Sequence, residues 1–279
     1  MNLFRTFCGA SRALTLAMAL ISGCAAQDAV DGWLELVAKT QAEQPRWITP
    51  VVTVTPRLEQ EFRYDISAQE LANGTTTVNI GGGKGVELIP SERVEVILGI
   101  PPYVDLGSAT AHDGFGDVGF LVKYRLLARN EQSGNYIVTA FLGMTSPTGS
   151  YNNGAEHAVI TPTVAAGKGW GNFSVQSTIG AGLPVADTAR LGRPILSNTA
   201  FQYRIMRKFW PEFEVNSTFW PDGTRAGKKQ VFLTPGLVVG RIPMRGRLGL
   251  TVAAGYQIAA THFHSYNRSF IVTVRLPFS

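Results

Sequence analysis

Charged side chains that alternate with apolar ones are the residues of this chain best placed to do chemistry. In residues 57–66, Glu59, Glu61, Arg63 and Asp65 occupy every second position, and the positions beside them carry Leu58, Phe62, Tyr64 and Ile66, with Gln60 the one polar exception. Further charged residues on the corresponding side of later segments are Glu95, Lys123, Arg125, Arg204, Glu214, Arg247 and Arg275. Such charges either pair and fill a narrow interior, or line a path and select a polar or amphipathic solute. We treat them as candidate lumen-lining residues and leave both readings open.

A second group of reactive side chains lies near the end of the chain, in His262-Phe-His264 followed by Ser265 and Asn267. Two imidazoles at strand spacing supply two ligands of a metal site, and a third ligand is missing locally. We therefore predict an exposed loop here, with no metal and no cofactor.

The N-terminus has the layout of a secretory signal peptide. Arg5 and Arg12 precede an apolar run over residues 13–21, which is followed by the small residues 22–26. This apolar core is shorter than the roughly 18 residues that a membrane-spanning helix needs. Two cleavage sites fit: one before Cys24, as in a lipoprotein with a lipidated cysteine, and one after Ala26, which we favour. In both cases the mature chain keeps at most one cysteine, which excludes an intramolecular disulfide and a cysteine-based metal site.

Composition narrows the class of protein. Charged residues make up 16% of the 279 residues, against roughly 25% in soluble domains. No apolar stretch after the N-terminus is long enough for a membrane helix, which excludes a multi-helix membrane protein. Removing residues 1–26 leaves 23 basic and 20 acidic residues, so the charge gives no argument for nucleic-acid binding.

The alternation itself predicts strands. Apolar and polar residues alternate through most of the chain after Pro56. Alternation with a period of two is typical of a strand with one apolar and one polar face. We expect about twelve strands, at residues 57–66, 75–88, 92–100, 117–128, 135–146, 157–167, 171–182, 198–208, 212–220, 230–241, 246–258 and 268–278. This length spans a bilayer when the strands are tilted.

The connections support the same fold. Short links alternate with long polar ones, which is typical of an outer-membrane barrel with periplasmic turns and external loops. Aromatic residues near the strand ends match interfacial girdles. If the first and last strands close the barrel, we expect Glu59 or Glu61 to pair with Arg275. A secreted β-sandwich or lipocalin-like barrel also alternates, but its strands are shorter.

Residues 32–43 contain good helix formers and end before Pro45. We interpret this segment as a short periplasmic helix or tether, and a plug for the barrel is the alternative. The predicted organisation is thus a signal peptide at 1–26, a periplasmic segment at 27–55 and an outer-membrane antiparallel up-and-down β-barrel at 56–279.

Three stretches carry a family resemblance: Thr55-Pro-Arg-Leu-Glu-Gln-Glu-Phe-Arg-Tyr-Asp65, residues 114–127 with the run Gly-Asp-x-x-x-x-x-Lys-Tyr-Arg, and residues 268–278. Together they resemble the outer-membrane family named for the MetA pathway of phenol degradation. The resemblance covers residues 55–278 and implies a bacterial outer-membrane barrel that passes small hydrophobic or aromatic compounds. Such barrels usually end on an aromatic residue that the assembly machinery reads. Here Phe278 is followed by Ser279, and Pro277 interrupts the last strand.

We therefore predict an outer-membrane channel or transporter for small solutes, without enzymatic activity. Its expected partners are outer-membrane lipid, the barrel-assembly machinery and an unidentified solute, and no nucleic acid. One alternative is a non-transporting surface barrel whose lumen is closed by ion pairs. The third alternative is a lipid hydrolase, because the His, Ser and Asn residues of this loop invite comparison with outer-membrane phospholipase A, another twelve-stranded barrel. In that enzyme family the His and Ser lie at alternate strand positions on one side, whereas the adjacent His264 and Ser265 would face opposite sides of a strand.

Overall fold

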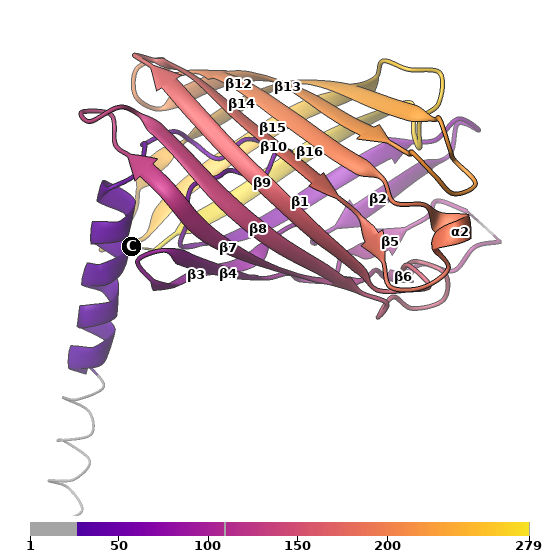
Figure 1. The fold of residues 1–279 in the computed structure, drawn as a ribbon, viewed down its shortest axis with the longest axis horizontal. Coiled ribbons are helices and arrows are strands. Elements are labelled where there is room, and N and C mark those ends of the chain that lie inside the picture. The colour runs from indigo at the N-terminus through magenta and orange to yellow at the C-terminus, as the bar shows by residue number, and fades with distance from the viewer. Residues whose placement is uncertain (1–26, 109, 279) are drawn as a thin grey trace, which may run out of the picture.

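The computed structural model describes residues 27–108 and 110–278. Within them the chain forms a closed antiparallel barrel of twelve strands, preceded by a helix at residues 27–42 (Figure 1). The predicted signal peptide and Cys24 lie outside the described residues. None of the described helices is both long enough and apolar enough to cross a membrane.

Eight of the twelve barrel strands are continuous over the described residues, and the other four consist of two collinear pieces. The continuous strands are β1 (Glu61–Glu70), β8 (Tyr136–Ser146), β9 (Val159–Trp170), β12 (Ile195–Tyr203), β13 (Phe209–Phe219), β14 (Lys229–Pro243), β15 (Gly249–Ala259) and β16 (Arg268–Pro277). The divided strands are β2 (Thr76–Ile80) with β3 (Gly85–Ser91), β4 (Val94–Leu98) with β5 (Tyr103–Asp105), β6 (Gly114–Phe115) with β7 (Val118–Arg129), and β10 (Phe173–Ala181) with β11 (Leu183–Pro184).

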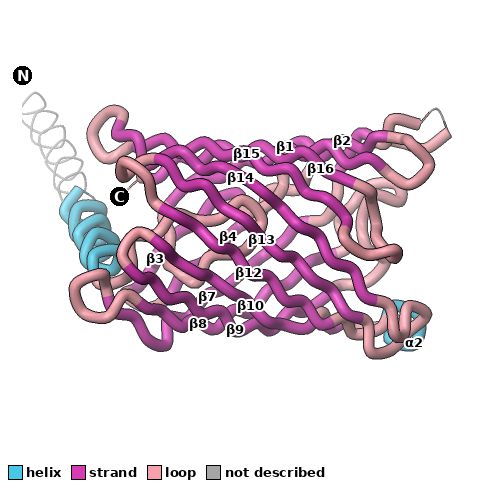
Figure 2. The backbone as a smooth tube through the Cα atoms, turned by 90° about the horizontal axis from the view of Figure 1, so that it is seen from above, coloured by secondary structure: helices cyan, strands magenta, loops and turns pink. Residues whose placement is uncertain are grey.

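Sequential strands pair in order around the barrel, and β16 closes it against β1 in a register that runs from Glu61 opposite Pro277 to Glu70 opposite Arg268. The short connections lie at one end, together with the N-terminal helix and the end of β16 (Figure 2). We call this the turn end. The long connections, including the short helix α2 (Thr188–Leu191), lie at the other end, which we call the loop end. The predicted fold class is confirmed.

The strand bounds differ from the predicted ones at two informative places. The first strand begins at Glu61 instead of residue 57, because residues 57–60 still belong to a segment inside the barrel. The strand expected at 198–208 ends at Tyr203, and residues 204–208 form a turn.

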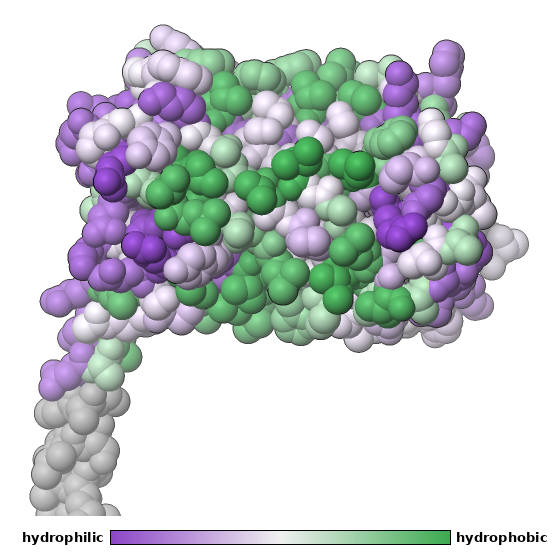
Figure 3. All heavy atoms as spheres, viewed as in Figure 1, coloured by the Kyte–Doolittle hydropathy of each residue, from purple (hydrophilic) through white to green (hydrophobic). Residues whose placement is uncertain are grey.

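The barrel is apolar outside and polar inside. Glu87, Glu95, Thr139 and Gln176 are each 0% exposed on inward positions. The outward positions carry large apolar residues that are exposed, among them Val122, Leu127, Leu142, Phe213 and Phe270. In Figure 3 the apolar residues gather over the middle of the wall, and hydrophilic residues gather at both ends. This distribution is opposite to that of a water-soluble barrel, whose apolar face points inward.

Candidate functional site: a lumen closed by the N-terminal segment

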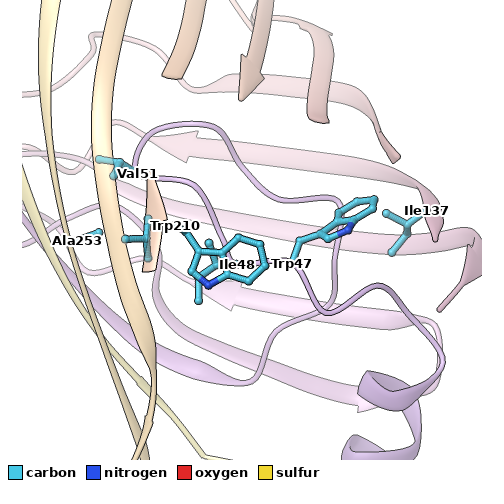
Figure 4. Close-up of a cluster of buried hydrophobic side chains, with 7 residues drawn as sticks. Trp47, Ile48, Val51, Ile137, Trp210 and Ala253 are labelled. Atoms are coloured by element: carbon cyan, nitrogen blue, oxygen red, sulfur yellow. The ribbon is translucent and has the colours of Figure 1, made fainter. Parts of the chain in front are cut away.

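The interior of the barrel is occupied by residues 44–60, which we call the inner segment. Almost all of these residues are buried, and the segment runs through the lumen before the chain joins the wall at Glu61 (Figure 4). Its base is closed by two hydrogen bonds: Gln44 Nε2 donates to the Leu58 carbonyl (2.7 Å), and the Leu58 N–H donates to Gln44 Oε1 (3.0 Å). The segment therefore forms a loop that enters and leaves at the turn end.

Two carboxylates on β13 hold the apex of the inner segment. Glu212 accepts the Val51 N–H (2.8 Å), and Glu214 accepts the N–H groups of Val52 (2.8 Å) and Thr53 (2.6 Å). Glu212 also accepts a hydrogen bond from Gln202 Nε2 (2.7 Å). Three consecutive backbone N–H groups thus donate to carboxyl oxygens of the wall.

The carbonyl groups of the same segment are held by donors on β16 and β10. Arg275 donates to the carbonyls of Thr49 and Pro50, the second at 2.7 Å. Gln176 Nε2 donates to the Ile48 carbonyl (2.9 Å). Because these contacts use backbone atoms of the segment, they do not depend on its side chains.

An apolar cluster completes the closure. Trp47, Ile48 and Val51 of the inner segment pack against Ile137, Trp210, Val238 and Ala253 of the wall. Figure 4 shows these side chains along the segment. The wall makes room for the indole of Trp47 with glycine, since a Cβ at Gly167 would lie 2.4 Å from a Trp47 ring carbon.

Ion pairs fill the space beside the segment. Lys123 Nζ lies 3.0 Å from Glu95 and also donates to the Arg57 carbonyl (3.0 Å). Arg57 pairs with Glu59.

On β1, Arg63 pairs with Asp65 at 2.9 Å. The expected pairing of Arg275 with Glu59 or Glu61 is wrong, because Arg275 is engaged by the inner segment. One carboxylate oxygen of Glu61 is buried without a hydrogen-bond partner.

The N-terminal helix sits on the turn end. Trp33 Nε1 donates to the Ile89 carbonyl (2.7 Å), and Val37 is buried with Leu58 and Ile89.

Arg125 and Lys39 add polar contacts to this docking. Arg125 donates to the Thr40 carbonyl (2.8 Å) and pairs with Glu43 (3.1 Å). Lys39 Nζ lies 2.6 Å from Glu92, and this hydrogen bond holds the pKa of Glu92 below its ordinary value.

Two of the sequence-derived candidates lie at the rim. Arg204 is half-buried at the turn end, where it pairs with Glu131 (3.0 Å) and lies over the ring of Trp210. Arg247 is exposed in the turn after β14, so its assignment to the lumen lining is corrected. The alternation that begins at Leu248 does not extend back to Arg247, because residues 245–247 form the turn.

Several residues of the site were not among the sequence candidates. Glu212, Gln176, Gln202 and Gln44 contact the inner segment or each other. One available signal was the pair of inward acids on β13, since the register sets Glu212 and Glu214 beside Gln202, Ala200, Gly236 and Thr234, with no cation among them. Two acids without a basic neighbour in a narrow barrel imply a further partner.

At the loop end, both ring nitrogens of His264 are engaged by neighbouring residues. The ring nitrogens of His264 contact the Thr261 carbonyl (2.7 Å) and Asn267 Oδ1 (3.0 Å). Elsewhere at this end, Glu156, His157 and Asp187 bring potential ligand atoms within 4.8 Å of one another. Both carboxylates of that group, however, pair with Arg190.

Comparison with known proteins places this architecture in a family. The model of the family described as "Putative MetA-pathway of phenol degradation" matches residues 60–232. The chain belongs to this family. A search of curated proteins found no match.

Among solved structures, the chain is similar to an outer membrane channel from Pseudomonas putida F1, at 15% identity and a TM-score of 0.54, covering 77% of this chain and 92% of that one. It is also similar to the NanC porin, at 10% identity and a TM-score of 0.50, covering 77% of this chain and 99% of that one. At these identities the likeness concerns the fold.

Proposed function

We propose that the protein is an outer-membrane channel for small solutes in which the inner segment is a displaceable plug. The observation that carries the proposal is the kind of contact that closes the lumen. Wall side chains bind backbone atoms of the segment through Glu212, Glu214 and Arg275. The wall residues that face the segment include many further polar side chains, such as Thr139 and Gln176. A lumen designed only to be filled needs no such lining, since apolar packing fills a core with less desolvation cost.

The apolar outer surface of the barrel supports a location in the outer membrane. A wall of exposed apolar residues requires lipid around it, and bacterial barrels of this kind reside in the outer membrane. We propose that the chain is exported by the signal peptide at 1–26, that the assembly machinery inserts it, and that the turn end faces the periplasm. Mass spectrometry of the mature N-terminus tests export and distinguishes cleavage after Ala26 from a lipidated Cys24.

The solute class rests on a cavity beside the plug. A volume of about 420 Å³ lies between the inner segment and the wall, lined in part by Val51, Val52, Val54 and Ile271. Polar groups of Arg63 and Asp65 reach the same cavity. Its size is in the range of small-molecule sites, and an apolar surface with few polar groups suits a small aromatic solute. The family name supports the same class.

The closed lumen also favours a competing function, a surface barrel that does not transport. Deletions separate the two. Removing residues 27–57 should leave a folded barrel that admits phenylalanine and arabinose in liposome swelling much faster than the wild type does. Removing only residues 27–43 is the matched control and should change uptake little, because the inner segment remains. If the wild type and both deletion variants fold and admit no solute, the channel proposal fails.

A further inference from the structure

A second cavity, of about 410 Å³, opens at the turn end between the inner segment and the wall. Four arginines line it: Arg46 from the inner segment, Arg204 and Arg207 from the turn before β13, and Arg241 from β14. Trp210 and the carboxylate of Glu131 also line the cavity. The lining is therefore strongly basic.

The positive charge in this cavity is only partly balanced. Glu131 pairs with Arg204 at 3.0 Å. Arg241 lies 3.4 Å from Glu59, whose nearer partner is Arg57. Among the ion pairs of residues 27–108 and 110–278, none involves Arg46 or Arg207. Like charges gathered around a concave surface raise the local potential and attract a counter-anion.

The backbone gives an independent indication. Met206 and Arg207 have φ values of 50° and 62°. Hairpin turns with two such residues strongly prefer Asn and Gly, because a Cβ in the left-handed region is strained. Arg207 thus carries its guanidinium at a backbone position that favours glycine, and residues in such strained conformations cluster at binding sites.

We propose that this cavity binds an anion of phosphate or carboxylate chemistry. Guanidinium groups match the oxygen geometry of both anions and form charge-assisted pairs with them. Because Arg46 belongs to the inner segment and the other arginines to the wall, the bound anion joins the two. By linkage it therefore favours the state in which the segment is docked. Binding itself does not depend on transport.

The test uses the full chain, folded in detergent and titrated with inorganic phosphate by calorimetry. In a second arm, the protein is titrated with phosphatidylcholine vesicles with and without phosphatidylglycerol, which distinguishes a lipid headgroup from a free anion. Arg46→Gln with Arg207→Gln should weaken binding of the active probe by about tenfold or more. Arg245→Gln with Arg247→Gln is the matched control, since it removes the same charge from the neighbouring turn, and it should change binding by less than about twofold.

Arg207→Gly separates binding from folding. It removes the guanidinium and relieves the left-handed strain, so the melting temperature should stay equal or rise while binding weakens. The proposal is overturned if neither probe binds saturably to the wild type. It is also overturned if the Arg245/Arg247 control loses as much affinity as the Arg46/Arg207 variant, because the attraction would then be diffuse.

Discussion

The carboxylate of Glu214 on β13 accepts the backbone N–H of Thr53 at 2.6 Å, across 161 residues of sequence. Its other oxygen accepts the N–H of Val52 at 2.8 Å. A wall side chain thus binds the inner segment as a receptor binds an extended peptide, through main-chain donors. Because one carboxylate satisfies two donors, Glu214 is the contact whose loss should free the segment most selectively.

Glu214→Gln replaces this acceptor with an amide that has one accepting oxygen and no charge. Hydrogen bonds to charged groups contribute about 1.5–3 kcal/mol, so the undocked population should rise about 10- to 100-fold. Single-channel recordings in planar bilayers should show more frequent or longer openings. Glu70→Gln is the control, since Glu70 pairs with Arg268 at the loop end and does not contact the inner segment. Equal opening frequencies in wild type and Glu214→Gln would show that this contact does not hold the plug.

Val122 lies near the middle of β7 with its side chain exposed on the outer wall. If the wall faces lipid, Val122→Arg should lower the free energy of unfolding in vesicles by about 2–4 kcal/mol, the cost of an arginine at the bilayer midplane. Val185→Arg is the matched control, because Val185 is 60% exposed in a connection at the loop end. Urea titrations that give the same small change for both variants would exclude lipid contact at Val122.

The contact between Lys39 and Glu92 predicts a pH dependence of helix docking. The pKa of Glu92 lies below its ordinary value of 4.5 because Lys39 donates a hydrogen bond to it. The stabilisation is therefore fully present above 4.5 and is lost as the pH falls through the lowered pKa. Both side chains are well exposed, so the effect should be small. A spin label at position 38 should gain mobility on acidification, and Glu92→Gln should remove this pH dependence; unchanged pH dependence in that variant would assign it to another group.

The sequence was sufficient for the barrel because its signal is repeated in every strand. Alternation in segments such as 117–128 is imposed by lipid on one side and a polar lumen on the other, and it survives errors of a few residues at each strand end. Turns are less well determined. The assignments of Arg204 and Arg247 to the lumen extend an alternation beyond the ends of the strands, at Tyr203 and Gly249.

The closure of the lumen was harder to predict for a physical reason. Its contacts run from side chains such as Glu214 and Arg275 to backbone atoms, and every residue type offers the same N–H and C=O groups. Nothing in the side chains of residues 51–55 therefore marks them as the bound segment, and their β-branched composition is equally typical of a strand. The closure could have been predicted only from the wall, where Glu212 and Glu214 have no basic partner on the neighbouring strands.

The most direct test of the central claim joins the inner segment to the wall. Thr53 Oγ1 and Asn216 Nδ2 lie 3.4 Å apart, so Thr53→Cys with Asn216→Cys, made in a Cys24→Ser background, places two thiols side by side for oxidation or a short bifunctional thiol reagent. Liposome swelling should fall to the protein-free baseline once the crosslink forms, as verified by mass spectrometry, and should recover when a disulfide is reduced. Solute uptake that is the same with the segment crosslinked and released would contradict the account, because the path would then not depend on displacement of the plug.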